Sequence, residues 1–374
     1  MQKDKHIHIV SFDNPYPPDY GGAIDVLFKL KAFQEAGIDV TLHIFEYKRC
    51  NRGELEKYCT KVNYYHRPTS LWYQFSALPF IVNTRKSKSL LDNLLRDNDP
   101  ILFEGLHTTL FLNHPALAKR TKIVRTHNIE HEYYTLLAHR EKNWLKKIYF
   151  RIEAFKLKRY EPNLAFASGI AAISQTDCEY FRILNSNTRC VGAFHPFSGI
   201  DCQKGTGEYI LYHGNLEVAE NQEAAAYILN NLTAEMELPL IIAGKNPPDK
   251  LLQQCQRFSN VKIIGNPSDK EMAGLITNAQ IHLLPTFQPT GVKLKLLYAL
   301  FSGRHVLVTP EMVIGSDLQN ICVVCHSPVE FKQQIRRLYK QPFDEQMLSN
   351  RQSALTEHYN NQQNIAKLQD LLFS

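Results

Sequence analysis

A histidine stands directly after a short β-branched run, within Thr126-His127-Asn128-Ile129-Glu130-His131. The first residue beyond a parallel strand lies at the sheet edge where α/β proteins bind ligands, so His127 is placed to hydrogen-bond a hydroxyl or carbonyl group of a substrate. Glu104 ends another such run and is a second catalytic candidate at the same edge. The alternative for both is a structural side chain, satisfied inside the fold. The histidine spacing differs from the zinc-binding H-E-x-x-H pattern, so we expect no metal here.

Two adjacent glycines, Gly21 and Gly22, end a loop that begins at Asn14 and precede a helical pattern. They lack the spacing of the dinucleotide-binding G-x-G-x-x-G fingerprint. Glycine lets the backbone approach a ligand closely, and a helix N-terminus offers free N–H groups and a favourable dipole to an anion. The sequence therefore indicates either an anion-binding turn or a tight turn that needs glycine.

The segment 285–298 joins a loop to a helix that carries Lys293 and Lys295. Gly291 opens this helix, so free N–H groups, the helix dipole and a lysine cation together would suit a pyrophosphate. The alternative is a surface helix with solvated lysines.

A basic amphipathic helix is predicted at 144–160. Four apolar residues share one stripe of this helix, namely Leu145, Ile148, Ile152 and Phe155. Basic residues lie elsewhere around it, namely Lys142, Lys146, Lys147, Arg151, Lys156, Lys158 and Arg159. Such a helix can lie on an anionic membrane surface. It can equally face the protein core with its outer face charged.

These candidates need a scaffold of βα repeats, and β-branched runs do alternate with amphipathic stretches along the chain. Six strands are expected in the first half, at 6–11, 39–45, 61–65, 101–104, 122–126 and 170–174. Six more are expected at 209–213, 238–243, 261–264, 281–284, 305–309 and 322–325. Helices are expected at 23–36, 221–232, 269–277, 292–302 and 329–339, the first of them ended by Gly37.

A stretch rich in turn formers, 194–207, separates the two halves, and we place the domain boundary after residue 195. The predicted fold class is α/β, with two doubly wound Rossmann-like domains that face a central cleft. They would span 1–195 and 196–360, followed by a C-terminal helix at 361–374.

The bulk composition is that of a globular protein with two domains, since 374 residues exceed what one compact core usually holds. The net charge of +6 suits anionic small molecules or an anionic membrane, and we expect no nucleic acid partner. No apolar run approaches the ~20 residues that cross a bilayer, and the first residues lack the apolar region of a signal peptide. A cytoplasmic location is therefore expected.

One cysteine motif has a functional alternative. Cys322-Val323-Val324-Cys325-His326 spells the C-x-x-C-H pattern of covalent haem attachment. We favour a buried strand, because Ser327, Pro328 and Glu330 follow as the N-cap, first and third residues of a helix. Haem attachment would also require export.

In the order and spacing of its short motifs, the chain resembles the GT-B glycosyltransferases of the large family four. The motifs are 14–22, Thr126-His127-Asn128, Tyr212-His213-Gly214-Asn215 and Thr290-Gly291-Val292-Lys293-Leu294-Lys295. The resemblance implies a hexosyltransferase that moves a sugar from a UDP- or GDP-sugar to a glycan or lipid-linked acceptor. It further implies retention of the anomeric configuration, no metal or other cofactor, and polysaccharide synthesis at the inner face of the plasma membrane.

The resemblance also implies a set of site residues. His127 would contact the donor sugar, and the final helix, from about residue 361, would cross back onto the first domain. The donor-binding residues would be Gly21, Gly22, Gly214, Asn215, Thr290, Gly291, Val292, Lys293, Lys295 and Tyr298.

Two departures from the family pattern keep other functions open. The family commonly carries an E-x7-E pair, and the matching positions here are Thr290 and Tyr298. An arginine and a lysine often follow the first strand of the second domain, where this chain has N-L-E-V-A-E-N at 215–221. The alternatives are a GT-B subunit that has lost catalysis and regulates or docks on an assembly complex, and a GT-B-shaped sugar-nucleotide epimerase or phosphorylase.

Overall fold

The computed structural model describes residues 5–47, 49, 51–233, 236–288 and 293–374. The chain divides into two compact units: Met1–Pro196 with Tyr359–Ser374 form unit 1, and Phe197–His358 form unit 2. The boundaries expected from the sequence fall after residues 195 and 360. Within the described ranges, no helix has the length and apolar character needed to cross a membrane.

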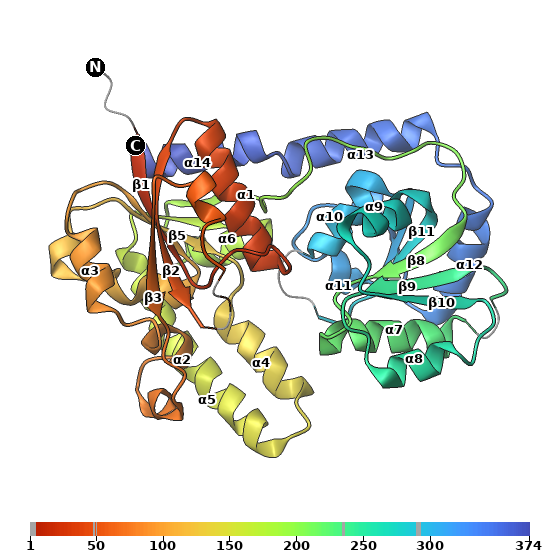
Figure 1. The fold of residues 1–374 in the computed structure, drawn as a ribbon, viewed down its shortest axis with the longest axis horizontal. Helices are drawn as coiled ribbons and strands as arrows, with labels where there is room; N and C mark the ends of the chain where they lie inside the picture. Colours follow the sequence, from red (N-terminus) through yellow and green to blue (C-terminus); the bar gives the residue numbers. More distant parts are fainter. Residues whose placement is uncertain (1–4, 48, 50, 234–235, 289–292) are drawn as a thin grey trace. The chain divides into compact units, whose positions relative to one another are not determined.

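Unit 1 is built on a seven-stranded parallel sheet in the order β3-β2-β1-β4-β5-β6-β7 (Figure 1). Its strands are β1 (His6–Ser11), β2 (Asp39–Glu46), β3 (Lys61–His66), β4 (Ile101–Glu104), β5 (Lys122–Thr126), β6 (Gly169–Ala172) and β7 (Thr188–Cys190). Most of these runs are apolar and buried, as parallel strands covered on both faces must be. The strand order reverses between β1 and β4, and the carboxyl ends of such strands are where α/β sheets bind ligands.

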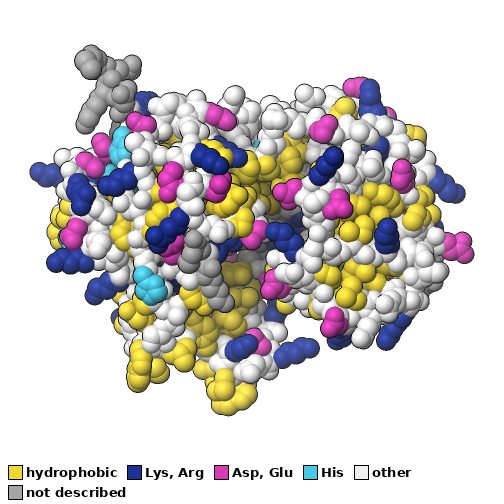
Figure 2. All heavy atoms as spheres, viewed as in Figure 1, with side chains coloured by type: hydrophobic (Ala, Val, Ile, Leu, Met, Phe, Trp, Pro, Cys, Tyr) yellow, Lys and Arg dark blue, Asp and Glu magenta, His cyan; other side chains and the backbone are white. Residues whose placement is uncertain are grey.

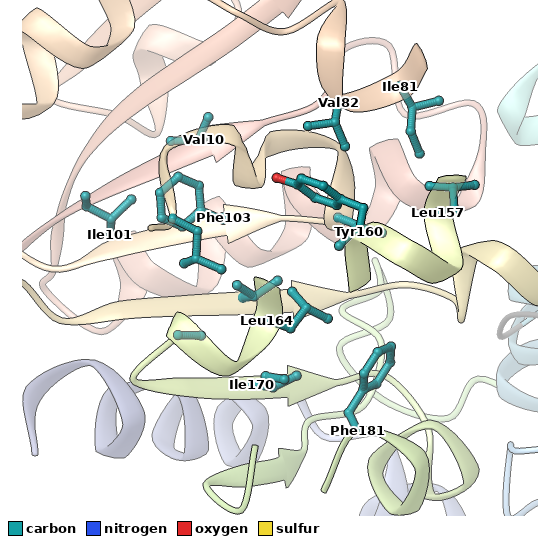
Figure 3. Packing of buried hydrophobic residues seen from close by; sticks show 14 of the residues in the cluster. Val10, Ile81, Val82, Ile101, Phe103, Leu157, Tyr160, Leu164, Ile170 and Phe181 are labelled. Carbon is teal, nitrogen blue, oxygen red and sulfur yellow. The ribbon is translucent and has the colours of Figure 1, made fainter. Parts of the chain in front are cut away.

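Helices cover both faces of this sheet. On one face, α1 (Gly21–Glu35) and α14 (Asn361–Phe373) pack against the strands in one apolar cluster. Gly37 follows α1 with a φ of +68°, a left-handed conformation that favours glycine. The other face carries α2 (Phe80–Asn83), α3 (Lys88–Leu94), α5 (Trp144–Tyr160) and α6 (Gln175–Arg182). Their apolar side chains belong to a second buried cluster with Phe103, part of which is drawn in Figure 3. Short 3-10 helices, η1 to η5, lie at Leu55–Lys57, Leu71–Phe75, Leu106–Phe111, Pro115–Leu117 and Glu161–Phe166.

α5 forms an antiparallel hairpin with α4 (Glu130–Arg140) (Figure 1). Its buried residues are Glu153, Ala154, Leu157 and Tyr160. The apolar stripe predicted from the sequence, Leu145 to Phe155, lies exposed on another face. The alternative in which this stripe faces the core is therefore wrong, because the helix buries a different set of positions.

Unit 2 has a six-stranded parallel sheet in the order β10-β9-β8-β11-β12-β13. Its strands are β8 (Tyr209–His213), β9 (Leu240–Gly244), β10 (Val261–Gly265), β11 (Ala279–Leu284), β12 (His305–Val308) and β13 (Val323–Val324). Its helices are α7 (Ala219–Asn231), α8 (Asp249–Cys255), α9 (Asp269–Asn278), α10 (Leu294–Ser302), α11 (Pro310–Val313), η6 (Gln319–Ile321), α12 (Pro328–Tyr339) and α13 (Glu345–His358). Here the strand order reverses between β8 and β11.

The predicted fold class, two doubly wound α/β units, is confirmed. The prediction of six strands in the first half was wrong, because it missed β7, a three-residue strand at the edge of its sheet. The buried strand predicted at 322–325 shrinks to the half-buried Val323–Val324. The helix expected after it begins as predicted, since the Ser327 side chain accepts a hydrogen bond from the Glu330 N–H.

Candidate active site and donor-binding site

Glu104 and His127 meet where the strand order of unit 1 reverses. β4 pairs with both β1 and β5, so residues at the carboxyl ends of these strands lie side by side. Glu104 ends β4, His127 follows β5, and His127 Nε2 lies 3.0 Å from Glu104 Oε2. The structure thus brings the two predicted residues together. Glu104 is fully buried, however, and lies behind His127.

Three further charged residues join them, and we call Asp25, Lys29, Glu104, Arg125 and His127 the charged cluster. Lys29 Nζ donates to Glu104 Oε1 at 2.6 Å and to Asp25 Oδ2 at 2.8 Å. Arg125 Nη2 donates to Asp25 Oδ1 at 3.0 Å. Each buried carboxylate therefore has a cationic partner, which is the condition under which charges are tolerated inside a protein.

The cations decide the ionisation of the two carboxyl groups. Burial alone would raise the pKa of each, because a low dielectric disfavours the charged form. For Asp25 the charges of Arg125 and Lys29 outweigh burial and hold the pKa well below its usual range. For Glu104 the charge of Lys29 and the hydrogen bond from His127 likewise lower the pKa. Both groups are carboxylates at neutral pH.

This ionisation assigns the two nitrogens of His127. The Nε2 that faces the Glu104 carboxylate carries a proton and donates it, an assignment that follows from the geometry. In the neutral ring Nδ1 is then an acceptor. Nδ1 lies 3.9 Å from Asp25 Oδ2, and 12% of the side chain is exposed. His127 can therefore accept a hydrogen bond from a substrate hydroxyl through Nδ1, and can donate one there when protonated.

The glycine pair lies beside this histidine. Gly22 stands in the first turn of α1, which begins at Gly21 and has no side-chain cap from its N-cap residue Tyr20. A Cβ at Gly22 would lie 2.7 Å from Phe12 Cζ, so glycine is what admits this ring. Phe12 in turn packs edge-on against the His127 ring, at a centroid distance of 5.5 Å. The N-terminus of α1 is thereby held at the same sheet edge as His127.

The charged cluster does not fit a metal ion, although Asp25, Glu104 and His127 each place a ligand atom within 4.8 Å of the others. The Lys29 ammonium already contacts both carboxylates and supplies the positive charge. His131 does not converge on this point either, because its Nδ1 lies 3.0 Å from Glu161 Oε2. Glu130 is buried near Glu161, and burial followed by that neighbouring charge raises its pKa to about 8.

A second group of residues meets at the strand reversal of unit 2. Gly214 and Asn215 follow β8, Asn221 lies in α7 and Lys295 in α10. Lys295 Nζ donates to Asn221 Oδ1 at 2.7 Å, and Asn221 Nδ2 donates to the Asn215 carbonyl at 2.8 Å. A Cβ at Gly214 would lie 3.2 Å from Asn221 Cγ, so glycine leaves room for this amide. The structure therefore brings Gly214, Asn215 and Lys295 together through Asn221.

Lys295 supplies the positive charge at this edge. Burial, reinforced by the nearby charge of Lys293, lowers the pKa of Lys295 to about 8. His213, at the end of β8, has its pKa lowered to about 3 by burial and then by Lys295, so it is neutral. A partly desolvated ammonium gains from an anionic partner, and this edge of the sheet can therefore receive a phosphate.

The other predicted donor residues are placed differently. Thr290, Gly291 and Val292 lie outside the described residues. Lys293 is the N-cap residue of α10. Tyr298 is half-buried, and its ring packs edge-on against Phe197 at 4.7 Å between centroids. Burial raises the pKa of this phenol.

The sequence analysis did not identify Asp25, Lys29 and Arg125 as site residues, although each is a charged residue within an apolar pattern. Asp25 and Lys29 stand four residues apart inside an apolar helical pattern, and Arg125 interrupts a β-branched run. A charge inside a buried pattern needs a partner, and these three are one another's partners.

The two units have the fold of solved GT-B glycosyltransferases. TarM resembles the chain with a TM-score of 0.68 and 12% identity, over 100% of this chain and 99% of TarM. A mutant of TarM from S. aureus, in complex with fondaparinux, α-GlcNAc-glycerol and UDP, matches with a TM-score of 0.63 and 11% identity, over 99% of this chain and 100% of that one. HepE from Anabaena, in complex with UDP and glucose, matches with a TM-score of 0.60 and 15% identity, over 98% of this chain and 99% of HepE. At such identities the likeness establishes the fold.

The sequence comparisons add a partial family match and one relative. Residues 207–341, all within unit 2, match the family model of group 1 glycosyltransferases, and this range includes Asn221 and Lys295. An uncharacterised 44.6 kDa protein in the cps region of Klebsiella pneumoniae is 29% identical over 330 residues, 83% of this chain and 84% of that protein. Part of unit 2 is thus similar to group 1 glycosyltransferases, and the chain has the fold of the GT-B structures named above.

Proposed function

We propose that this protein transfers a hexose from a UDP- or GDP-sugar to a glycan or lipid-linked acceptor, in the synthesis of a cell-surface polysaccharide. The observation that carries the proposal is Lys295, an ammonium at the strand reversal of unit 2 and inside the segment that matches group 1 glycosyltransferases. UDP in the TarM and HepE complexes supports a nucleotide-diphosphate donor. The cps-region relative supports a role in polysaccharide synthesis.

In this proposal unit 2 binds the donor. Lys295 pairs with the diphosphate, and Gly214 and Asn215 border it at the end of β8. Thr290, Gly291, Val292 and Lys293 precede α10 and offer further contacts to the phosphates and the sugar. Charge that develops on the departing diphosphate is then met by a prepositioned cation, so the reaction needs no metal or other cofactor.

Unit 1 would supply the group that contacts the sugar. His127 Nδ1 accepts from a sugar hydroxyl, while Nε2 stays bound to Glu104. Glu104, Lys29, Asp25 and Arg125 are positioning residues, because they act through the orientation of His127 and are buried behind it. Gly21 and Gly22 would offer the N-terminal N–H groups of α1 to an anionic group of a substrate.

The proposal includes retention of the anomeric configuration and a cytoplasmic location at the membrane that holds a lipid-linked acceptor. Retention is an expectation of the family resemblance, and the cytoplasmic location is the expectation drawn from the sequence.

A GT-B subunit without catalysis is the second candidate, and Tyr298 favours it. The family's carboxylate is replaced there by a phenol whose ring packs against Phe197. Loss of that carboxylate would weaken donor recognition through the ribose.

Incubation with a panel of UDP- and GDP-sugars and a lipid extract tests the proposal. One donor should be consumed only when acceptor is present, and NMR of the product should show the anomeric configuration of the donor. A free epimer as product would instead indicate an epimerase, and a sugar phosphate formed when inorganic phosphate is added would indicate a phosphorylase. Nucleotide binding without any turnover would favour the non-catalytic subunit.

A further inference from the structure

One edge of unit 1 exposes large apolar side chains from two segments that are distant in sequence. We call it the apolar edge, and its members are Leu71, Trp72, Phe75, Trp144, Leu145, Ile148, Ile152 and Phe155. Trp72 and Phe75 are 80% and 81% exposed, and Phe155 is 68% exposed. Figure 2 shows hydrophobic side chains gathered at the bottom of the view, over α5 and the neighbouring segment 71–75. Apolar side chains grouped in this way mark an interaction site.

Buried polar contacts hold the two segments together. Lys156 Nζ donates to the Gln74 carbonyl at 2.6 Å and to Glu153 Oε1 at 2.9 Å. Glu153 Oε2 accepts from the Phe80 N–H at 2.6 Å. Glu153 and Lys156 thus attach the loop that carries Trp72 and Phe75 to α5. The exposed aromatic residues are fixed beside the helix rather than left on a free loop.

A basic cavity opens beside this edge, between α4 and α5. Its volume is about 250 Å³, and its lining includes His131, His139, Arg151, Lys158 and the edge residue Phe155. None of the lining residues is acidic. Phe155 therefore belongs to both features, so an anion in the cavity would lie next to the exposed apolar side chains.

The surrounding charge favours a membrane over a protein partner. The segment 142–159 carries seven basic residues, and its single carboxylate, Glu153, is buried and paired with Lys156. Lysine is depleted in protein–protein interfaces, whereas Trp, Phe and Leu with flanking Lys and Arg are typical of helices that lie in the interface of an anionic bilayer.

We propose that unit 1 docks on an anionic lipid bilayer through the apolar edge, and that the basic cavity between α4 and α5 receives the phosphate of a lipid headgroup. The aromatic and aliphatic side chains of the edge enter the headgroup–acyl boundary. Arg151 and Lys158 pair with the phosphate at the same depth. This inference deepens the proposed membrane location and rests on it.

The chain provides its own probe, because its only two tryptophans, Trp72 and Trp144, both lie on the apolar edge. Vesicles that contain phosphatidylglycerol should shift the tryptophan emission to shorter wavelength and allow quenching by brominated acyl chains. Vesicles of phosphatidylcholine alone should give at least a tenfold weaker response. Emission that stays unchanged with anionic vesicles would overturn the proposal.

Matched variants separate the two features. Trp72→Ser with Phe75→Ser, read through Trp144, should weaken vesicle binding at least tenfold. Arg151→Gln with Lys158→Gln should do the same, whereas Lys142→Gln with Lys146→Gln removes equal charge outside the cavity and should weaken binding clearly less. Equal losses for the two basic pairs would show diffuse attraction only, and would overturn the headgroup site.

Two controls keep this test independent of the transferase. Vesicle binding is measured without donor, so its failure would leave sugar transfer untouched. Inorganic phosphate at millimolar concentration should not displace the protein from vesicles. Displacement by phosphate would show that the cavity binds free anions and that the bilayer is not its ligand.

Discussion

The orientation of the His127 ring is fixed by the carboxylate of Glu104, which is fully buried. Glu104 accepts from Nε2 and is itself ionised because Lys29 contacts it at 2.6 Å. The sequence could place His127 and Glu104 at one sheet edge, since both stand at strand ends. It could not show that Lys29, far away in sequence, would contact Glu104, because that depends on how α1 packs over the sheet. The same packing explains why Gly22 faces Phe12.

At the residue scale, His127→Ala should fold and lose most turnover. A positioned acid–base or hydrogen-bonding group typically contributes about 10²–10⁴-fold to a rate. The side chain is partly exposed, so the unfolding temperature should change little. The exposed His66→Ala is the matched control and should keep wild-type turnover. Wild-type turnover in folded His127→Ala would exclude a role for this residue.

Lys29→Met should destabilise the fold by about 3–5 kcal/mol at neutral pH, because it leaves two buried carboxylates without their shared cation. The carboxyl pKa values are depressed in the folded state, so their stabilising contribution is present above about pH 4 and is lost as the pH falls further. The deficit of the variant should therefore shrink in acid.

Urea unfolding of the wild type and Lys29→Met across this pH range measures the effect. Lys57→Met, which removes an exposed ion pair with Glu54, should change stability little at any pH. A deficit for Lys29→Met that is independent of pH would contradict the assigned ionisation.

At the scale of elements, buried central strands were predictable and short or exposed elements were not. Strands such as β1, β4, β5 and β8 are apolar runs whose ends coincide with polar residues. β7 has only three residues and pairs with one neighbour, so its sequence carries little signal. For α5 the periodicity predicted which apolar residues share a stripe, but not whether that stripe faces the core or the solvent. The core side of the helix is instead formed by Ala154, Leu157 and Tyr160.

The element that should respond most clearly to pH is α10, through Lys295. The pKa of this lysine lies at about 8, so its charge is lost as the pH rises through that value. Affinity for a nucleotide diphosphate should weaken over the same range. Lys295→Arg keeps a charge at high pH and should abolish this weakening.

Lys295→Met removes the charge altogether. Hydrogen bonds to charged groups contribute roughly 1.5–3 kcal/mol, so affinity should fall about ten- to hundredfold. Lys270→Met, on the exposed surface of α9, is the control and should bind as the wild type does. Equal affinities of wild type and Lys295→Met would remove this lysine from the donor site.

At the scale of the whole molecule, the two units carry different features. The group 1 match lies within unit 2, whereas the charged cluster and the apolar edge both belong to unit 1. The fold class followed from the alternation of strands and helices. The proposed donor site, by contrast, depends on a few contacts around Lys295, and neither periodicity nor composition encodes those contacts.

The central claim is that unit 2 binds a nucleotide-diphosphate sugar, and calorimetric titration with UDP and GDP tests it most directly. We expect one of the two nucleotides to bind and the matching nucleoside to bind far more weakly, because in the proposed site the diphosphate makes most of the contacts. Tyr298 offers the ribose less than a carboxylate would, so the 2′-deoxy form should bind nearly as well. Strong rejection of that form would mean that another residue recognises the ribose. If neither nucleotide binds at millimolar concentration, the proposed transferase is contradicted.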